Sequence, residues 1–81
     1  MGWYVYIVQC RDGSLYTGIT VDLDHRVLEH NTSKKGAKYT RSRRPVQLVY
    51  SEELLDRSSA LKREAAIKKI SRENKLKLIK Q

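Results

Sequence analysis

Residues 3–20 read WYVYIVQCRDGSLYTGIT, and this stretch decides the fold. Its two halves, residues 3–10 and 15–20, are rich in the β-branched and aromatic side chains that are typical of strands. Between them, residues 11–14 (Arg-Asp-Gly-Ser) have the composition of a turn, because glycine adopts a positive φ at little cost. The stretch therefore predicts a β-hairpin at the start of the chain.

The rest of the chain predicts one more strand and three helices. Asp22 can cap a helix that runs to about His30, and residues 46–52 have the composition of a third strand. A long helix is predicted from about residue 56 or 58 to residue 70, and Ser71 can cap a last helix over 72–80. The predicted fold class is α+β, a small three-stranded antiparallel sheet with flanking helices in the order β-β-α-β-α-α. At 81 residues the chain forms a single domain, 1–81, with a thin core.

The charge of the chain indicates a polyanionic partner. There are 17 Lys and Arg residues against 9 Asp and Glu, which gives +8 at pH 7. The excess is densest in residues 31–50, whose Gly, Ser and Thr content predicts a loop. Basic side chains there can contact phosphates, and a tyrosine can stack on an unpaired base; the alternative is a solvated, disordered loop without a partner. The candidate nucleic-acid-binding residues are Lys34, Lys35, Lys38, Tyr39, Arg41, Arg43 and Arg44.

Other classes of protein are disfavoured by the composition. The single cysteine, Cys10, allows no intramolecular disulfide, and one Cys with two His cannot build a zinc cluster. No apolar run approaches the length of a membrane span, and no signal peptide is evident. These features predict a cytoplasmic protein with no membrane partner, monomeric by default.

Polar residues occupy positions where the helical pattern favours apolar ones. Arg26 and His30, four residues apart, flank the inward face of the first predicted helix. Glu64 falls near the middle of the apolar arc of the long helix. A carboxylate there is costly unless it is paired or binds a cation. Lys68, one turn further on, offers a simple ion pair, and a divalent metal is the functional alternative.

Taken in order, these residues resemble the GIY-YIG endonuclease superfamily. The motifs are residues 4–6 (Tyr-Val-Tyr) and 16–18 (Tyr-Thr-Gly), followed by Arg26, His30 and Glu64. The first triplet keeps only the final Tyr of Gly-Ile-Tyr, and the second departs from Tyr-Ile-Gly at its middle residue. The resemblance covers nearly the whole chain. It is closest to small stand-alone bacterial members, which also carry a run like residues 36–40 (Gly-Ala-Lys-Tyr-Thr) before Arg-Arg-Pro.

The resemblance implies hydrolysis of DNA phosphodiester bonds with one divalent ion, Mg²⁺ or Mn²⁺. By that resemblance Glu64 holds the ion, and Arg26 binds the same phosphate and offsets charge in the transition state. DNA is expected as the partner rather than RNA. With no room for a separate targeting domain, a preference for nicked, branched or single-stranded structures is the expected form of selectivity.

The resemblance also implies roles for the tyrosines. Tyr16 is expected to be the base that activates the water, with Tyr6 orienting or assisting it. His30 would hydrogen-bond the tyrosine or relay a proton. Gly18 would let the backbone pass close to the site.

The hairpin register decides whether both tyrosines can share a site. If Asp12 and Gly13 form a plain two-residue turn, Gln9 pairs with Tyr16, and Tyr6 and Tyr16 then point to opposite faces. A shared site therefore predicts that the connection over residues 11–14 is not a plain two-residue hairpin.

Two other function classes stay open at this point. The same fold can serve as a nucleic-acid-binding module, for DNA or RNA, that cuts nothing. A protein-interaction domain is a third reading, which predicts an apolar patch and little salt dependence.

Overall fold

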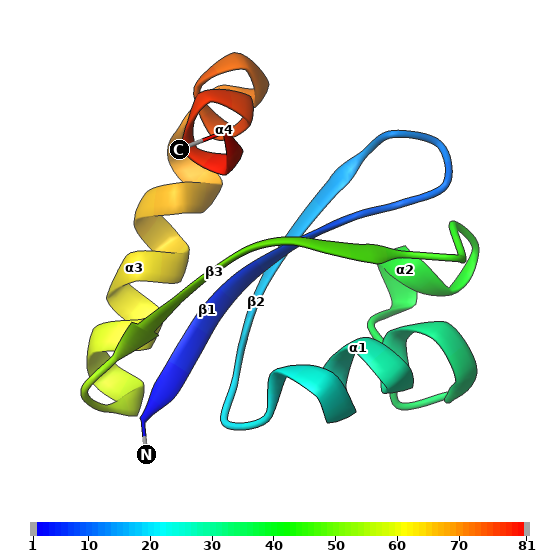
Figure 1. Cartoon of the computed structure of the whole chain (residues 1–81), viewed down its shortest axis with the longest axis horizontal. Coiled ribbons are helices and arrows are strands. Elements are labelled where there is room, and N and C mark those ends of the chain that lie inside the picture. The colour runs from blue at the N-terminus through cyan, green and yellow to red at the C-terminus, as the bar shows by residue number, and fades with distance from the viewer. Residues whose placement is uncertain (1, 81) are drawn as a thin grey trace.

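The computed structural model describes residues 2–80 and confirms the predicted order of elements (Figure 1). It adds one helical turn, α2, inside the basic stretch for which the composition predicted a loop. No helix within residues 2–80 combines the length and apolarity needed to cross a membrane. The elements are β1 Trp3–Gln9, β2 Leu15–Thr20, α1 Leu23–Thr32, α2 Lys38–Arg41, β3 Gln47–Leu54, α3 Arg57–Lys69 and α4 Arg72–Ile79.

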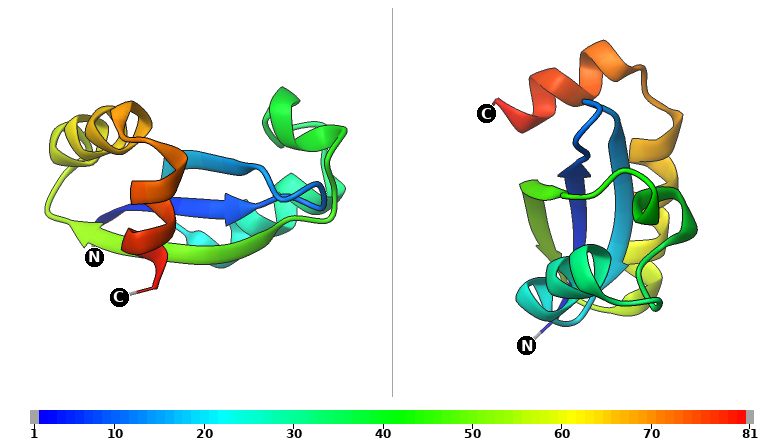
Figure 2. Two further views of the ribbon diagram at one scale, coloured as in Figure 1. Left: turned by 90° about the horizontal axis from the view of Figure 1, so that it is seen from above. Right: turned by 90° about the vertical axis from the view of Figure 1, so that its right-hand side faces the viewer.

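The three strands form one antiparallel sheet in the order β2-β1-β3, which separates two small cores. Figure 1 shows the sheet nearly edge on, with α3 and α4 on one side and α1 and α2 on the other. Val5 and Ile7 face α3 and pack against Ile67, whereas Tyr6 and Val8 face the α1 side. Figure 2 shows α4 turning away from the axis of α3 to run past β3. Alternate residues of the buried central strand therefore supply both cores.

The hairpin between β1 and β2 closes through a three-residue loop. The Gly13 N–H donates to the Cys10 carbonyl at 2.9 Å, and the Cys10 N–H donates to the Ser14 carbonyl at 2.8 Å. Gly13 has φ +87°, the left-handed conformation that such a loop requires at its third position. The resulting register pairs Tyr6 with Gly18 and Val8 with Tyr16. The prediction that this is not a plain two-residue hairpin is confirmed, and both tyrosines lie on the α1 face of the sheet.

A β-bulge in β3 allows this strand to contribute apolar side chains to both cores. Ile7 pairs with Tyr50, but the next residue of β1, Val8, pairs with Leu48, so β3 contains one extra residue. Tyr50 therefore packs on the α3 side, and Leu48 packs on the α1 side.

The two predicted helix caps, Asp22 and Ser71, are confirmed, and Asp56 is the cap of the long helix, for which the sequence left residues 56 and 58 open. Asp22 accepts a hydrogen bond from the His25 N–H at 3.1 Å, and Asp56 accepts one from the Ser59 N–H at 2.8 Å. The Ser71 hydroxyl accepts one from the Asn74 N–H at 3.2 Å. These bonds satisfy N–H groups that the first turn of a helix leaves without partners.

Candidate active site

Tyr6 and His30 form the centre of the α1 side of the molecule. The Tyr6 hydroxyl and His30 Nε2 are 2.7 Å apart, and both side chains are almost completely buried. Their rings meet edge to face, with centroids 5.8 Å apart. The strand β1 and the last turn of α1 bring these residues together across 24 positions of sequence. The family resemblance implied either such a hydrogen bond between His30 and a tyrosine or a proton relay through His30, and the structure shows the hydrogen bond with Tyr6.

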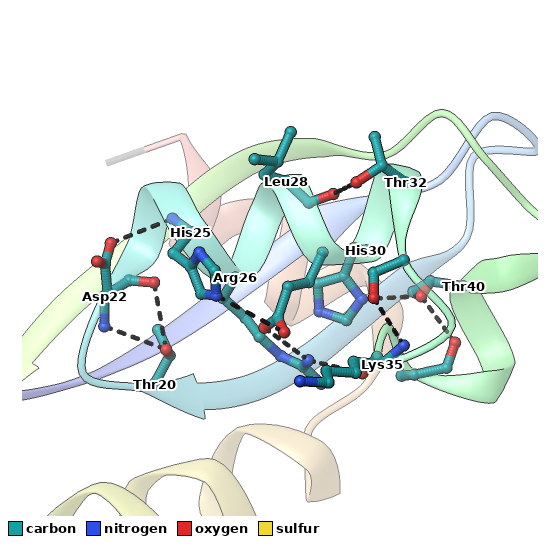
Figure 3. A network of polar contacts seen from close by, with 12 residues as sticks. Thr20, Asp22, His25, Arg26, Leu28, His30, Thr32, Lys35 and Thr40 are labelled. Carbon is teal, nitrogen blue, oxygen red and sulfur yellow. Dashed lines mark hydrogen bonds and ion pairs between the residues drawn. The ribbon is translucent and has the colours of Figure 1, made fainter.

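The other nitrogen of the His30 ring contacts a residue of α2. His30 Nδ1 lies 2.8 Å from the Thr40 hydroxyl oxygen, and that hydroxyl lies 2.9 Å from the Ala37 carbonyl oxygen (Figure 3). Thr40 is fully buried, although its neighbours in α2 are exposed. A continuous chain of hydrogen bonds therefore runs from the Tyr6 hydroxyl to the backbone of the basic stretch.

His30 is neutral at pH 7. Burial lowers its pKa from 6.5 to about 4, and the positive charges of Arg26 and Arg44 act in the same direction, partly opposed by Glu29. A neutral imidazole has one ring nitrogen that donates and one that accepts. His30 can therefore serve as an acceptor for one neighbour and a donor to the other.

Three candidate catalytic residues lie near enough to the Tyr6 hydroxyl to shift its pKa. Burial raises the pKa of Tyr6 to about 12. Arg26 lowers this pKa through hydrogen bonding and positive charge, whereas Tyr16 and Glu64 raise it because a phenolate on Tyr6 would face their negative charge. Arg26 of α1, Tyr16 of β2 and Glu64 of α3 are thus electrostatic neighbours of Tyr6.

Arg26 joins α1 to the basic stretch. Its guanidinium donates to the Lys35 carbonyl at 2.9 Å and to the Glu29 carboxylate at 3.3 Å (Figure 3). The side chain is partly buried, with 24% of its surface exposed. A guanidinium with five N–H donors can hold these partners and still offer donors to a phosphate.

Gly18 leaves the space that the Tyr6 ring occupies. A β-carbon at position 18 would lie 2.5 Å from the Tyr6 hydroxyl oxygen and 2.8 Å from the ring carbon Cζ. Because Tyr6 and Gly18 are paired across the hairpin, the ring of Tyr6 lies against the backbone of β2. Tyr6 can therefore take this position only because residue 18 has no side chain.

Tyr16 and Tyr39 form an aromatic stack beside the site. The Tyr16 ring meets His30 edge to face at 5.4 Å and stacks on Tyr39, with centroids 6.0 Å apart and planes at 24°. The Arg43 guanidinium lies 3.9 Å from the centroid of the Tyr39 ring. Tyr39 is thus stacked within the protein, so a nucleobase would have to displace one of these contacts to stack on it.

Glu64 is largely buried by its surroundings and is paired. Its side chain is 19% exposed, and its carboxylate lies 3.4 Å from Lys68 Nζ. The ion pair that the sequence offered as an alternative to metal binding is therefore present. No group of three or more His, Cys, Asp or Glu side chains that could hold a metal occurs within residues 2–80. A lone carboxylate fits a Mg²⁺ that keeps several waters and binds phosphate oxygens, but it does not form a protein cage.

The seven candidate nucleic-acid-binding residues divide into two groups. Those that are exposed are Lys34, Lys35, Lys38, Tyr39 and Arg41. The other two are bound to the fold: Arg43 pairs with Asp12 at 3.2 Å, and Arg44 donates to the backbone carbonyls of Glu29, His30 and Ser33. Arg44 holds the last turn of α1 through Nε and one Nη, so a phosphate contact by Arg44, which stays a prediction, would have to use its other Nη. The basic stretch is anchored to the fold, which argues against a freely solvated loop.

Thr40 is the residue of the site that the sequence did not single out. It lies in the run over residues 36–40 that entered only as part of the family resemblance. Thr is common in turns and loops, so a threonine in a basic stretch gives no signal of burial. Its role depends on a contact with His30 ten residues away, which only the folded chain displays.

Comparison with known sequences identifies one family. A family model described as the GIY-YIG catalytic domain matches residues 2–77. The chain is 63% identical over 78 residues to a UPF0213 protein of Desulfotalea psychrophila, covering 96% of this chain and 71% of that one. It is 58% identical over 78 residues to a UPF0213 protein of Staphylococcus saprophyticus, covering 96% and 94% of the two chains.

Two solved structures share this fold. The solution NMR structure of a UPF0213 protein of Bacillus halodurans is 45% identical, with a TM-score of 0.62, over 99% of this chain and 84% of that one. The solution NMR structure of protein EF2693 of E. faecalis is 43% identical, with a TM-score of 0.65 and the same coverage.

Proposed function

Because this chain belongs to the GIY-YIG catalytic domain family, a nuclease-type family, we propose that it is a metal-dependent endonuclease that hydrolyses DNA phosphodiester bonds. The observation that supports this most strongly is that the charges of Arg26, Tyr16 and Glu64 all act on the pKa of the Tyr6 hydroxyl. A cation, a phenol and a carboxylate at one place are the groups that phosphodiester hydrolysis needs.

Arg26 is the proposed phosphate-binding residue. Its guanidinium is held by the Lys35 carbonyl and by Glu29, so its direction is fixed before substrate binds. It can donate to two oxygens of one phosphate and stabilise the extra negative charge of the transition state. Its partial burial strengthens this interaction, because fewer waters compete for it.

Tyr16 is the proposed base that activates the water. Tyr6 is less suited to that role, since burial raises its pKa to about 12 and its hydroxyl is engaged with His30. Tyr16 is only partly buried, and its ring is held between His30 and Tyr39. In this assignment Tyr6 accepts a hydrogen bond from the water or the phosphate-binding arginine and so orients the reacting groups.

Glu64 is the proposed metal ligand. A divalent ion, Mg²⁺ or Mn²⁺, held there would neutralise charge on the scissile phosphate and on the leaving oxygen. Lys68 must release the carboxylate for this to happen. The Lys68 side chain is 53% exposed and Glu64 is 19% exposed, so solvent screens this half-exposed pair and its release costs on the order of 1 kcal/mol.

The exposed basic side chains near the site are the proposed DNA-binding surface. Lys34, Lys35, Lys38 and Arg41 can hold several phosphates without reading bases. The hydrogen bond from Arg26 to the Lys35 carbonyl supports this proposal, because it joins the basic stretch to the proposed phosphate-binding residue. Contacts to the backbone alone favour selectivity for DNA shape, such as nicks, branches or single-stranded ends, over selectivity for sequence.

A nucleic-acid-binding module without cleavage is the second candidate. The Glu64–Lys68 ion pair favours it, since a carboxylate that is already neutralised needs no metal. The two candidates share the basic surface and differ only in whether Glu64 and Arg26 act on a bound phosphate.

Cleavage assays with matched variants test the proposal. Wild type, Arg26→Ala and Glu64→Ala are compared on supercoiled DNA, branched DNA and RNA of the same sequence, with Mg²⁺, Mn²⁺ or EDTA. Glu73→Ala is the control, because Glu73 is an exposed acid on α4. We expect cleavage of DNA by wild type and the control only, and only with metal. Equal inactivity of all four proteins with intact binding supports the binding module, and full activity of Arg26→Ala or Glu64→Ala overturns the site assignment.

A further inference from the structure

The buried hydroxyl of Thr40 has two partners. It lies 2.8 Å from His30 Nδ1 and 2.9 Å from the Ala37 carbonyl oxygen. The residue is fully buried, so water does not satisfy it. Each proton in the chain from Tyr6 to Ala37 must therefore be assigned to a bond within the protein.

Two assignments of the protons are possible, and they differ in the His30 tautomer. In the first, the Tyr6 O–H donates to His30 Nε2, His30 Nδ1–H donates to the Thr40 oxygen, and the Thr40 O–H donates to the Ala37 carbonyl. In the second, the Thr40 O–H donates to Nδ1, and Nε2–H donates to the Tyr6 oxygen. The first uses every donor. The second leaves the buried Tyr6 O–H without an acceptor in residues 2–80, which costs about 1–3 kcal/mol.

We propose that Thr40 is a positioning residue that accepts a hydrogen bond from His30 Nδ1–H and so favours this tautomer. The unprotonated Nε2 of His30 then accepts a hydrogen bond from the Tyr6 hydroxyl. The lone pairs of the Tyr6 oxygen then face Arg26 and the reacting groups rather than His30. The Ala37 carbonyl also accepts the backbone N–H groups of Thr40 at 3.0 Å and Arg41 at 3.1 Å, so the direction of the chain is set by the Tyr6 O–H, which needs His30 Nε2 as its acceptor. The effect on catalysis rests on the proposed function, whereas the effect on the tautomer does not.

The same contact links the DNA-binding surface to the site. Thr40 lies on α2 between the exposed residues Lys38 and Arg41. A nucleic acid bound to Lys38 and Arg41 would therefore contact the same helix that carries the Thr40 hydroxyl. Arg44, which bonds the His30 carbonyl, keeps the other side of the histidine in place.

NMR of the imidazole nitrogens tests the tautomer without any assay of activity. The His25→Gln background leaves His30 as the only histidine. We expect Nδ1 to carry the proton in the parent protein and in Thr40→Ser. In Thr40→Val the buried Nδ1–H loses its acceptor, so we expect a detectable population with the proton on Nε2. A parent protein with the proton on Nε2, or a Thr40→Val protein that keeps it entirely on Nδ1, overturns the proposal.

Two further variants keep the test decisive. Thr40→Ala removes the hydroxyl with less crowding if Thr40→Val does not fold. Thr32→Val is the matched control, because the Thr32 hydroxyl also donates to a backbone carbonyl (Leu28, 2.8 Å) but lies on the exposed side of α1 (Figure 3). It should leave the His30 signals unchanged.

Kinetics separate positioning from stability. In an active protein, Thr40→Val should lower kcat about 10- to 100-fold with KM within about twofold, and Thr40→Ser should restore most of kcat. A loss of folded protein without a change in kcat per folded molecule means that Thr40 is merely structural. If no protein cleaves, the proposed function fails, while the NMR result still decides the tautomer.

Discussion

The ring of Tyr6 lies against Gly18, and the two residues are directly paired between β1 and β2. A β-carbon at position 18 would meet the Tyr6 hydroxyl oxygen at 2.5 Å. We therefore expect Gly18→Ala to push Tyr6 away from His30, to destabilise the fold by about 1–3 kcal/mol and to abolish cleavage. Urea unfolding and the cleavage assay measure these effects.

Gly13→Ala is the control for this substitution. Gly13 has φ +87° and open space around its α-carbon, so alanine there strains the hairpin loop by about 1–2 kcal/mol without touching the site. We expect its activity per folded molecule to match wild type. Similar losses of activity in both variants would show that the hairpin as a whole, rather than the Tyr6 position, is sensitive.

The stability of the protein should depend on pH through His30. Its pKa is about 4 in the folded protein against 6.5 as the usual value, so between these limits the unfolded chain binds a proton that the folded protein excludes. The free energy of unfolding should therefore fall as pH drops from 6.5 to 4, by roughly 3 kcal/mol, and lose nothing more from this group below pH 4. Urea unfolding from pH 4 to 7 measures this slope, which His30→Gln should flatten. An NMR titration of His30 with a midpoint above pH 6 would contradict it.

Arg44 should be a stability residue. Its guanidinium bonds three backbone carbonyls at the end of α1, a geometry that lysine cannot reproduce. Arg44→Lys should cost about 2 kcal/mol in unfolding experiments, whereas Arg41→Lys at an exposed position should change stability by less than about 0.5 kcal/mol. Equal stability of the two variants would mean that the carbonyl contacts contribute nothing.

The basic surface should set the salt dependence of DNA binding. Replacing Lys34, Lys35 and Lys38 together by Gln removes three phosphate contacts, so the slope of log K against log salt should become shallower by about 2–3. The matched control replaces three exposed cations of the last helix, Arg72, Lys77 and Lys80. If both triple variants change the slope equally, overall charge rather than this surface controls binding.

Lys68 should compete with a divalent ion for Glu64. Its ammonium lies 3.4 Å from the carboxylate, so Lys68→Ala should tighten Mn²⁺ binding about two- to fivefold, as expected for an exposed ion pair of up to about 1 kcal/mol. Water proton relaxation measures Mn²⁺ binding directly. Lys69→Ala, at an exposed neighbouring position, should leave the affinity unchanged, and Glu64→Ala should abolish it. Unchanged affinity in Lys68→Ala would remove Lys68 from the site.

The fold was largely predictable because local signals agreed with one another. The capping residues Asp22 and Ser71 begin two helices where the sequence predicted them, and Asp56 caps the long helix at one of the two starts that the sequence left open. The hairpin register followed from one requirement, that Tyr6 and Tyr16 share a face, and the left-handed Gly13 satisfies it. The one-turn helix α2 was missed because four residues carry too little periodicity to be distinguished from a loop.

The candidate site was predictable as a set of residues but not as a set of contacts. Arg26, His30 and Glu64 stood out because polar side chains occupied inward positions. The hydrogen bonds of Arg44 to the end of α1 and of Thr40 to the His30 ring could not be predicted. These groups become neighbours only when the chain folds. The stack of Tyr39 on Tyr16 likewise depends on the path of the basic stretch over β2.

The hydrogen-bonded group of Tyr6, His30 and Thr40 is also part of the core, and this has an evolutionary consequence. In a domain this small, replacing any of the three removes buried packing together with function. If the proposed cleavage is correct, a lineage that lost it would thus keep them under selection for folding, while the more exposed Arg26 and Glu64 would be free to drift. Positions 26 and 64, which still carry arginine and glutamate in this chain, are therefore the ones whose divergence would mark the loss of cleavage among its relatives.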